Sequence, residues 1–316
     1  MQKKQAPEKI LVIKLSALGD FIQALGPMAA IRKHHPDAHI TLLTTKMLAS
    51  FGEKSGYFDE VMIDGRPKFF DLPGWINLRN NLVRKGFSRV YDLQNNDRTC
   101  FYFKLFPSNN KPEWVGIAKG ASHQNTSEQR TAGHAFEGHV DTLKKAGIQS
   151  IEIDDMKWIQ EDVSGFSLKS PYILFVPGSA PQHPQKRWSA ESYGTLANAL
   201  NDEGYQVVLL GTAAEKDVTD EIEKTCPRVL NLSEQTSLFQ IVSLAHNAKA
   251  AIGNDTGPMH MIGPTGCPTL VLFSKHSNPE RHAPKGKHIK TLQKDSLSEL
   301  ETDHVFETFK NHIASL

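Results

Sequence analysis

Short apolar runs alternate with longer amphipathic segments in the first half of the chain. The short runs are rich in β-branched residues and predict strands at 10–15, 39–44, 60–63 and 89–93. The longer segments repeat their apolar residues at helical spacing and predict helices at 20–35, 75–85, 97–106 and 134–146. Such alternation indicates βαβ units built around a parallel sheet.

The second half repeats this alternation after an irregular stretch. Residues 107–133 are rich in Ser, Asn, Gly, Lys and His and predict a long loop, whereas 150–170 predicts an inter-domain linker. Strands are then predicted at 172–176, 206–210, 228–232, 248–252 and 268–273. Helices are predicted at 190–201, 215–224, 238–246, 259–265 and 297–314. A length of 316 residues and two α/β series predict two domains, with a ligand site in a cleft between them.

Composition narrows the classes of function. Lys and Arg total 36 against 35 for Asp and Glu, so no global positive charge recruits nucleic acid or an anionic membrane. Three dispersed cysteines are typical of a reducing compartment, and the polar N-terminus predicts neither a signal peptide nor a membrane span. We therefore expect a cytoplasmic protein. The sequence has no G-x-G-x-x-G, P-loop, G-x-S-x-G or HExxH motif, which disfavours dinucleotide oxidoreductases, Walker ATPases, α/β-hydrolases and zincins.

The segment 253–260 reads Gly-Asn-Asp-Thr-Gly-Pro-Met-His directly after a predicted strand. Proline in the first turn of a helix costs no hydrogen bond, and a helix start presents unpaired N–H groups that suit a phosphate. Asp255 would repel a phosphate, so we expect it to cap the helix and fix the loop. A capped strand-to-helix turn without any ligand is the alternative, and these eight residues do not decide between the two.

Three further groups follow predicted strands. Asp20 begins a helix after Gly19 and suits either a helix cap or a proton acceptor. Lys186 and Arg187 end the proline-rich loop 177–188 and suit either a diphosphate clamp or a solvated loop. Glu215 begins another helix and suits either a partner for ribose hydroxyls or a plain first-turn acid.

Taken in order, these groups resemble a family. The segments 10–33, 177–193, 211–217 and 253–260 are similar to motifs of glycosyltransferase family nine, the bacterial ADP-heptose:lipopolysaccharide heptosyltransferases. The resemblance extends along nearly the whole chain. It implies an α/β fold of the GT-B class, in which two Rossmann-like domains with parallel sheets face each other across a cleft. It implies an acceptor-binding domain at 1–165, a nucleotide-sugar-binding domain at 166–296, and a helix at 297–316 that packs back on the first domain.

The same resemblance implies roles for individual residues. Asp20 corresponds to the proposed general base, and Lys186 to the basic residue on the diphosphate. The remaining residues implied to contact the donor are Ser179, Arg187, Glu215, Asp255, Thr256, Gly257 and His260. His260 lies four residues after Thr256, so both side chains project from one helical face. Preorganised donors aimed at the leaving diphosphate would contribute about 10²–10³-fold each to the rate.

Some segments depart from the family pattern. Pro181, His183 and Pro184 stand where the family has hydroxyl-bearing residues, and the chain beyond Lys33 resembles the family only diffusely, most clearly at 92–94 and at Arg98. Family acceptors are typically acidic. The cations that suit such an acceptor, or that form ordinary solvated surface, are Arg66, Lys68, Arg98, Lys119 and Arg130.

These observations predict an inverting glycosyltransferase that uses no metal and no cofactor. It would move a heptose or related sugar from a nucleotide-diphosphate donor, with ADP-heptose favoured, to a lipopolysaccharide core or another acidic glycan or glycolipid. We expect no nucleic-acid partner and at most peripheral contact with the inner membrane. The alternatives are a sugar-nucleotide epimerase of similar fold and a non-catalytic nucleotide-sugar-binding protein.

Overall fold

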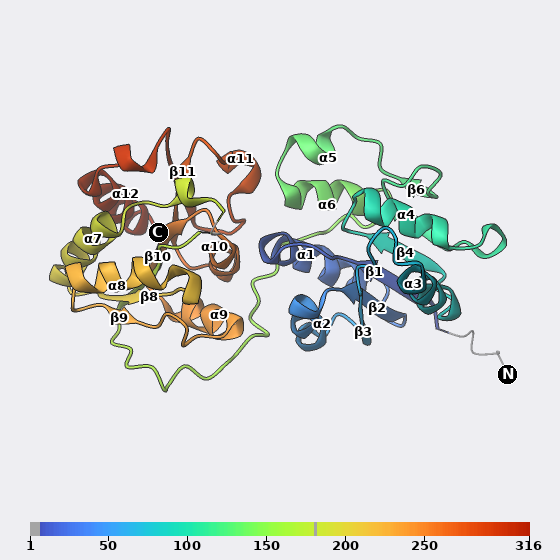
Figure 1. The fold of residues 1–316 in the computed structure, drawn as a ribbon, viewed down its shortest axis with the longest axis horizontal. Coiled ribbons are helices and arrows are strands. Elements are labelled where there is room, and N and C mark those ends of the chain that lie inside the picture. Colours follow the sequence, from blue (N-terminus) through green and yellow to red (C-terminus); the bar gives the residue numbers. More distant parts are fainter. Residues whose placement is uncertain (1–6, 180–181) are drawn as a thin grey trace. The chain divides into compact units, whose positions relative to one another are not determined.

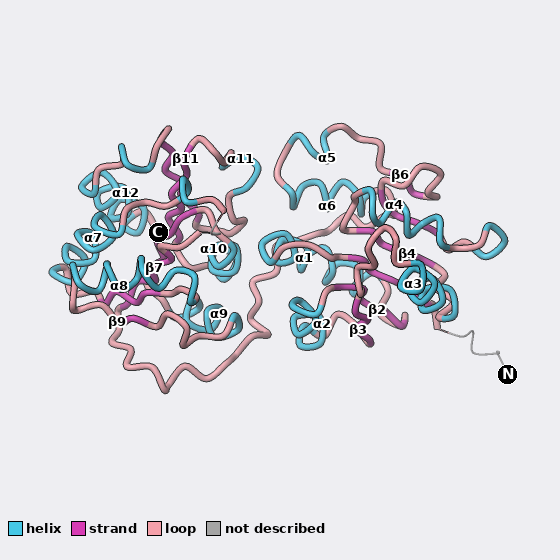
Figure 2. Tube along the Cα trace, viewed as in Figure 1, coloured by secondary structure: helices cyan, strands magenta, loops and turns pink. Residues whose placement is uncertain are grey.

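The computed structural model describes residues 7–179 and 182–316, and the chain divides into two compact units, Met1–Asp154 and Asp155–Leu316 (Figure 1). Each unit is built on one parallel six-stranded sheet, whose strands are drawn in magenta in Figure 2. Two Rossmann-like sheets were the expectation from the sequence, and the structure confirms them.

In the first unit the sheet order is β3-β2-β1-β4-β5-β6, and all neighbouring strands are parallel. The strands are β1 (Lys9–Ile13), β2 (His39–Thr44), β3 (Glu60–Ile63), β4 (Arg89–Asp92), β5 (Glu113–Gly116) and β6 (His123–Gln124). The helices are α1 (Leu18–His34), α2 (Ala49–Ser55), α3 (Leu72–Arg84), α4 (Asp97–Leu105), α5 (Gln129–Ala132) and α6 (Ala135–Lys144), with the 3-10 turns η1 (Lys46–Leu48) and η2 (Ser108–Asn110). The direction of winding reverses between β1 and β4.

In the second unit the order is β12-β11-β10-β7-β8-β9, again with all neighbours parallel. The strands are β7 (Tyr172–Val176), β8 (Gln206–Leu209), β9 (Leu230–Asn231), β10 (Ala250–Asn254), β11 (Thr269–Ser274) and β12 (Ile289–Lys294). The helices are α7 (Ala190–Asp202), α8 (Lys216–Thr225), α9 (Leu238–Asn247), α10 (Gly257–Ile262), α11 (Pro279–His282) and α12 (Thr302–Ala314), with 3-10 turns η3 (Pro184–Lys186), η4 (Ala213–Glu215), η5 (Gly263–Thr265) and η6 (Leu297–Glu299). Here the winding reverses between β7 and β10.

Strand β7 shows why helices cover both faces of the second sheet. All five of its residues are apolar and buried, because successive side chains alternate between the two faces. Ile173 and Phe175 pack with residues of α7, α8 and α12. Tyr172, Leu174 and Val176 pack with residues of α9 and α10. The sheet is therefore doubly wound, which leaves the carboxyl ends of its strands as the edge where loops can form a site.

Two segments differ from the sequence-based expectation. The predicted loop 107–133 contains β5 and β6, and β12 follows β11 where no strand was predicted. Strand β5 pairs with β4 in parallel, and Trp114 and Val115 of β5 are buried. β5 and β6 have at most two adjacent apolar residues and β12 is mostly polar, so these strands carry no apolar run of their own and are ordered by pairing with a neighbouring strand.

The linker belongs to the second unit. The unit boundary lies at Asp154 and Asp155 rather than at the predicted 165/166. Met156 and Ile159 are buried, and the backbone N–H of Glu161 donates a hydrogen bond to Ser243 Oγ of α9 at 2.8 Å. These contacts fasten 156–161 to the second unit although the segment has no regular secondary structure.

The C-terminal helix packs within the second unit. Val305 and Phe309 of α12 are fully buried in the core that α7 forms with the second sheet, and packing of this helix on the first domain remains a prediction. Its apolar face is satisfied inside its own unit. Within the described residues, no helix is long and apolar enough to cross a membrane.

Candidate active site

The segments singled out by sequence lie at the two points where strand order reverses. In the second unit, 177–188 follows β7 and 255–260 follows β10, and these two strands are neighbours. In the first unit, 14–20 follows β1 and 93–98 follows β4, which are also neighbours. Doubly wound sheets bind ligands at this position, because the loops diverge there and leave a crevice beyond the strand ends.

Asn254, the last residue of β10, joins the two loops of the second unit. Its side chain is fully buried. Its Oδ1 accepts hydrogen bonds from the Trp188 backbone N–H at 3.2 Å and from the Tyr193 hydroxyl at 3.1 Å. Its Nδ2 donates to the carbonyl oxygens of Pro177, at 2.6 Å, and Gly178, at 3.3 Å. One side chain thus fixes both ends of the 177–188 loop against β10.

Asp255 pairs with Lys186 at the same edge. The Lys186 Nζ lies 2.8 Å from Asp255 Oδ2, and the Ser277 hydroxyl donates to the same oxygen at 2.6 Å. The N-cap residue of α10 is Thr256, and no side chain makes a capping hydrogen bond there. The expectation that Asp255 caps the helix is therefore wrong, whereas its expected fixing of the loop is confirmed by the bond to Lys186.

Ser179 and Arg187 hold the proline-rich loop in shape. The Ser179 hydroxyl donates to the His183 carbonyl at 2.9 Å, and the Arg187 Nε donates to Ser179 Oγ at 3.0 Å. A second Arg187 nitrogen donates to the Ser179 carbonyl at 2.8 Å. The side chain of Ser179 is buried, so these bonds organise the loop from within. Pro181, which departs from the family pattern, lies outside the described residues.

Glu215 completes the edge on the β8 side. Its carboxylate accepts a hydrogen bond from the Thr212 backbone N–H at 2.8 Å and forms a capping box with that residue. A Cβ atom at Gly178 would collide with the Glu215 side chain, so glycine at that position lets Glu215 keep its present side-chain position. Glu215 thus acts as a first-turn acid of its helix, which was one of the two expectations for it. In that position its carboxylate lies beside the loop that follows β7.

The remaining motif residues begin α10. Thr256, Gly257 and His260 are half-buried, and Thr256 and His260 flank the first turn. Gly253 lies beneath them in β10, where a Cβ atom would stand 2.6 Å from Met259 Sδ and 2.8 Å from Val176 Cβ. A side chain there would push α10 away from the sheet.

In the first unit, Gln94 positions the loop after β1. Its Oε1 accepts hydrogen bonds from the backbone N–H groups of Leu15, at 2.8 Å, and Ser16, at 3.0 Å. Its Nε2 donates to Ser16 Oγ at 2.9 Å. The similarity noted at 92–94 thus corresponds to a physical contact between the two strand ends.

Asp20 stands in the first turn of α1 with an exposed side chain. The N-cap residue of that helix is Ala17, and no side chain makes a capping hydrogen bond there. The interpretation of Asp20 as the cap is therefore wrong. Its Oδ2 accepts a hydrogen bond from Ser16 Oγ at 3.4 Å. An exposed carboxylate of this kind is geometrically available to accept a proton.

A buried charged cluster lies behind that loop. The Lys14 Nζ donates to the Leu93 carbonyl at 3.2 Å and lies 3.4 Å from His139 Nε2. Burial lowers the pKa of Lys14 to about 8, against the opposing effect of the Asp20 and Asp92 charges. Burial raises the pKa of Asp92 to about 6, although the backbone N–H groups of Asn95 and Gln94 stabilise its charge. Burial and the Lys14 charge lower the pKa of His139.

The proposed acceptor cations do not form one group. Arg98 donates to the Pro67 carbonyl and the Tyr102 hydroxyl, each at 3.1 Å, so it lies beside the segment that contains the exposed Arg66 and Lys68. Lys119 lies between β5 and β6, and Arg130 lies in α5. The structure brings three of the five candidates to one segment.

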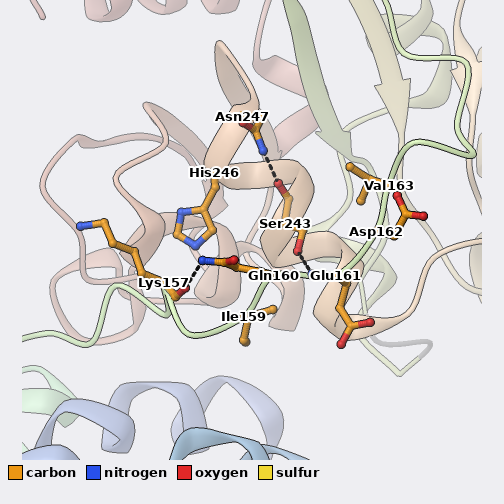
Figure 3. Close-up of a pocket in the computed structure, with 9 residues that line it drawn as sticks. All are labelled: Lys157, Ile159, Gln160, Glu161, Asp162, Val163, Ser243, His246 and Asn247. Atoms are coloured by element: carbon orange, nitrogen blue, oxygen red, sulfur yellow. Dashed lines mark hydrogen bonds between the residues drawn. The ribbon is translucent and has the colours of Figure 1, made fainter.

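A surface pocket of about 600 Å³ lies elsewhere in the second unit (Figure 3). It is lined by residues of the linker and of α9: Lys157, Ile159, Gln160, Glu161, Asp162, Val163, Ser243, His246 and Asn247. The carboxyl end of α9 leads into the amino end of β10, so this pocket adjoins the opposite edge of the sheet from the motifs. It contains no residue that the sequence singled out.

The described residues contain no group of three or more His, Cys, Asp or Glu side chains arranged to hold a metal ion. Metal independence remains a prediction about the reaction.

Sequence reasoning missed several residues that build the site. Asn254 stood inside the quoted motif, and the signal that could have found it was an amide side chain two residues after the predicted strand 248–252. Lys14 and His139 meet only through the fold, and Ser277 reaches Asp255 from a loop that follows β11. No local pattern marks these three.

Two doubly wound sheets with polar loops at both reversal points define a two-domain α/β protein of the nucleotide-binding type. A family model, "Glycosyltransferase family 9 (heptosyltransferase)", matches residues 75–311. The chain is 39% identical over 299 residues to "Lipopolysaccharide heptosyltransferase 2" of Escherichia coli, a match that covers 85% of this chain and 83% of the relative. The protein therefore belongs to glycosyltransferase family 9, as the sequence motifs predicted.

Solved structures agree on the fold. A family 9 glycosyltransferase from Veillonella parvula has a TM-score of 0.83 at 22% identity, with 99% of each chain covered. The E. coli heptosyltransferase WaaC with ADP-2-deoxy-2-fluoro heptose has a TM-score of 0.76 at 18% identity, covering 96% of this chain and 99% of that one. These likenesses confirm the expected GT-B fold class.

Proposed function

We propose that this glycosyltransferase moves a heptose from ADP-heptose to the core of a lipopolysaccharide in the cytoplasm, by an inverting mechanism without a metal ion. The observation that supports this most strongly is the gathering of the family motifs around Lys186 and Asp255 at the carboxyl edge of the second sheet. The names of the relatives supply the sugar, the nucleotide and the acceptor class.

The second unit would hold the donor. A lysine ammonium has three N–H donors, and Asp255 receives one from Lys186, whose side chain remains partly exposed. The others would meet the leaving diphosphate, with the first turn of α10 and the residues Thr256, Gly257 and His260 beside it. Asp255 and Ser277 would keep the ammonium in place before the donor arrives. Glu215 would accept hydrogen bonds from the ribose hydroxyls.

The first unit would hold the acceptor. Asp20 would take the proton from the attacking hydroxyl while that oxygen bonds to the anomeric carbon from the face opposite the diphosphate. The bond between the anomeric carbon and the diphosphate oxygen breaks in the same step, so ADP leaves and the configuration inverts. Arg66, Lys68 and Arg98, which meet at one segment, and Arg130 of α5 would attract the acidic groups of the acceptor.

The test is a transfer assay with purified protein, ADP-heptose and heptose-deficient lipopolysaccharide core. Asp20→Asn should lower kcat by about 10²–10⁴-fold while leaving the donor dissociation constant within twofold. Lys186→Met should lower kcat/KM by about 10²–10³-fold and weaken donor binding. Asp37→Asn and Lys224→Met change exposed residues outside the candidate site and serve as matched controls. Native kinetics in Asp20→Asn would remove that residue as the base.

The same assay separates the alternatives. An epimerase would convert the donor without any acceptor, and a binding protein would release no ADP under any condition. Transfer that continues in excess EDTA would support metal independence, and a strict requirement for Mg²⁺ would contradict it. The anomeric configuration of the product, read by NMR, would distinguish inversion from retention.

A further inference from the structure

Five apolar side chains form an exposed patch on the first unit: Phe69, Phe70, Leu72, Ile76 and Phe101, hereafter the apolar patch. Their exposed fractions are 86%, 92%, 66%, 51% and 44%. They are five of the nine large apolar side chains that are exposed among the described residues. Singly exposed apolar residues are ordinary, but a gathering of this kind marks an interaction surface.

The patch is held in a fixed shape. The rings of Phe69 and Phe70 meet edge to face with centroids 5.0 Å apart. Leu72 and Ile76 lie one turn apart on the exposed side of α3, whereas Leu78 and Leu82 of the same helix are buried.

Trp75 links the parts of the patch. Its indole N–H donates to the Lys68 carbonyl at 2.9 Å, which ties the preceding loop to α3. Its ring lies 4.9 Å from that of Phe101 in α4. The apolar side chains therefore come from a loop and two helices that Trp75 links through one hydrogen bond and one ring contact.

Positive charge borders the patch. Arg66, Lys68 and Arg79 have exposed side chains within the same stretch of chain. Of the two acids there, Asp64 is buried and accepts a hydrogen bond from Tyr102, and Asp71 caps α3 through the backbone N–H of Gly74. Exposed cations beside the patch, Arg66, Lys68, Arg79 and Lys104, outnumber the exposed acids Asp71 and Asp97, so the border is net positive, whereas the whole chain carries a formal charge of only +1.

We propose that the apolar patch docks on the surface of an anionic phospholipid bilayer. Aromatic side chains insert at the boundary between headgroups and acyl chains, and neighbouring cations gain from anionic headgroups. A symmetric contact between two copies of the patch would instead bring Arg66, Lys68 and Arg79 against their own counterparts, which like charges oppose. The charge pattern thus favours a bilayer over a second copy. The inference does not depend on the donor or on the proposed reaction, and it shares only Arg66 and Lys68 with the cations proposed to meet the acceptor.

Vesicle co-sedimentation of the full-length protein tests this, with phosphatidylcholine vesicles containing 30% phosphatidylglycerol against phosphatidylcholine alone, roughly a third of the lipid being anionic. The protein should partition onto the anionic vesicles and bind the neutral ones far more weakly. Phe69→Ser with Phe70→Ser should reduce the partition coefficient by roughly tenfold or more, because both rings are lost from the interface. Arg79→Gln should reduce it roughly fivefold on anionic vesicles only.

Two variants control for general effects. Ile153→Ser with Leu316→Ser removes two exposed apolar side chains outside the patch and should leave binding within twofold. Phe69→Trp with Phe70→Trp keeps the interfacial aromatic groups and should retain binding. Since Phe69 and Phe70 are almost fully exposed, the serine variant should keep the wild-type melting temperature, so lost binding would not reflect misfolding.

The inference is overturned if the wild-type protein does not bind anionic vesicles, or if the serine variant binds them as well as the wild type. It is also overturned if sedimentation velocity without lipid shows a dimer that the serine variant abolishes, since the patch would then be an interface between copies. Failure of vesicle binding would leave the transfer assay unaffected, so the two proposals fail separately.

Discussion

Replacement of Asn254 by alanine should release the two loops of the candidate donor site. The change leaves the Trp188 backbone N–H, the Tyr193 hydroxyl and the Pro177 carbonyl without their partner. A buried group that loses its hydrogen bond costs about 1–3 kcal/mol. A water molecule can enter the space that the side chain leaves, which favours the low end, about 3 kcal/mol for the three groups.

Calorimetry of the second unit's unfolding transition measures this loss. For a unit of this size, about 3 kcal/mol corresponds to a fall of about 6–12 °C in Tm. Asn198→Ala is the matched control, because its half-buried amide donates one hydrogen bond, to the Thr225 carbonyl, and should cost about 1 kcal/mol. Donor binding should be lost in Asn254→Ala and preserved in the control.

A double-mutant cycle tests the reasoning itself. Tyr193→Phe alone should cost about 1 kcal/mol, because Asn254 Oδ1 loses one donor. In the Asn254→Ala background the same change should cost nothing, since the hydroxyl is already without a partner and its burial strongly raises its pKa, which keeps it neutral. Additive effects of the two changes, or a stability of Asn254→Ala within about 1 kcal/mol of wild type, would refute the role assigned to this network.

Two further predictions concern charge at the candidate sites. Burial raises the pKa of Asp92 from 3.8 to about 6, so between these pH values the folded chain binds a proton that the unfolded chain releases, and this residue's contribution to stability increases as pH falls through that window. Urea unfolding of the wild type relative to Asp92→Asn should show this gain between pH 7 and pH 4, and a difference that does not vary with pH would contradict it. Ser277→Ala removes the 2.6 Å hydrogen bond to Asp255 and should weaken donor binding roughly fivefold, corresponding to about 1 kcal/mol, whereas the exposed Ser298→Ala should not. Equal donor affinity in both serine variants, measured by calorimetric titration, would show that Ser277 does not position Asp255.

Prediction from the sequence succeeded where a segment has a distinct apolar run or a helical period of its own. Strands β2, β3 and β7 have the predicted bounds, and α1, α7 and α9 lie within two residues of theirs. It failed at β5, β6 and β12, which are short or polar and are ordered by pairing with a neighbouring strand. The sequence also did not show that the apolar face of α12 packs in the core of the second unit, because an amphipathic helix shows which of its faces is apolar but not which surface covers that face.

The sequence by itself determined the alternation of strands and helices, the family, and the segments at which a site would form. Those are properties of local pattern, since each motif follows a strand and begins a helix within a few residues. Only the tertiary structure decided which side chains meet. Lys186 and Asp255 are 69 positions apart, and Lys14 and His139 are 125 apart, yet each pair lies within 3.5 Å at a reversal of strand order. Contact at such separations depends on the order and register of the strands, which no local pattern specifies. The same structure showed that neither Asp20 nor Asp255 caps its helix, although the sequence suggested that role for both. The Asp20 carboxylate instead accepts a hydrogen bond from Ser16, and that of Asp255 accepts one from Lys186.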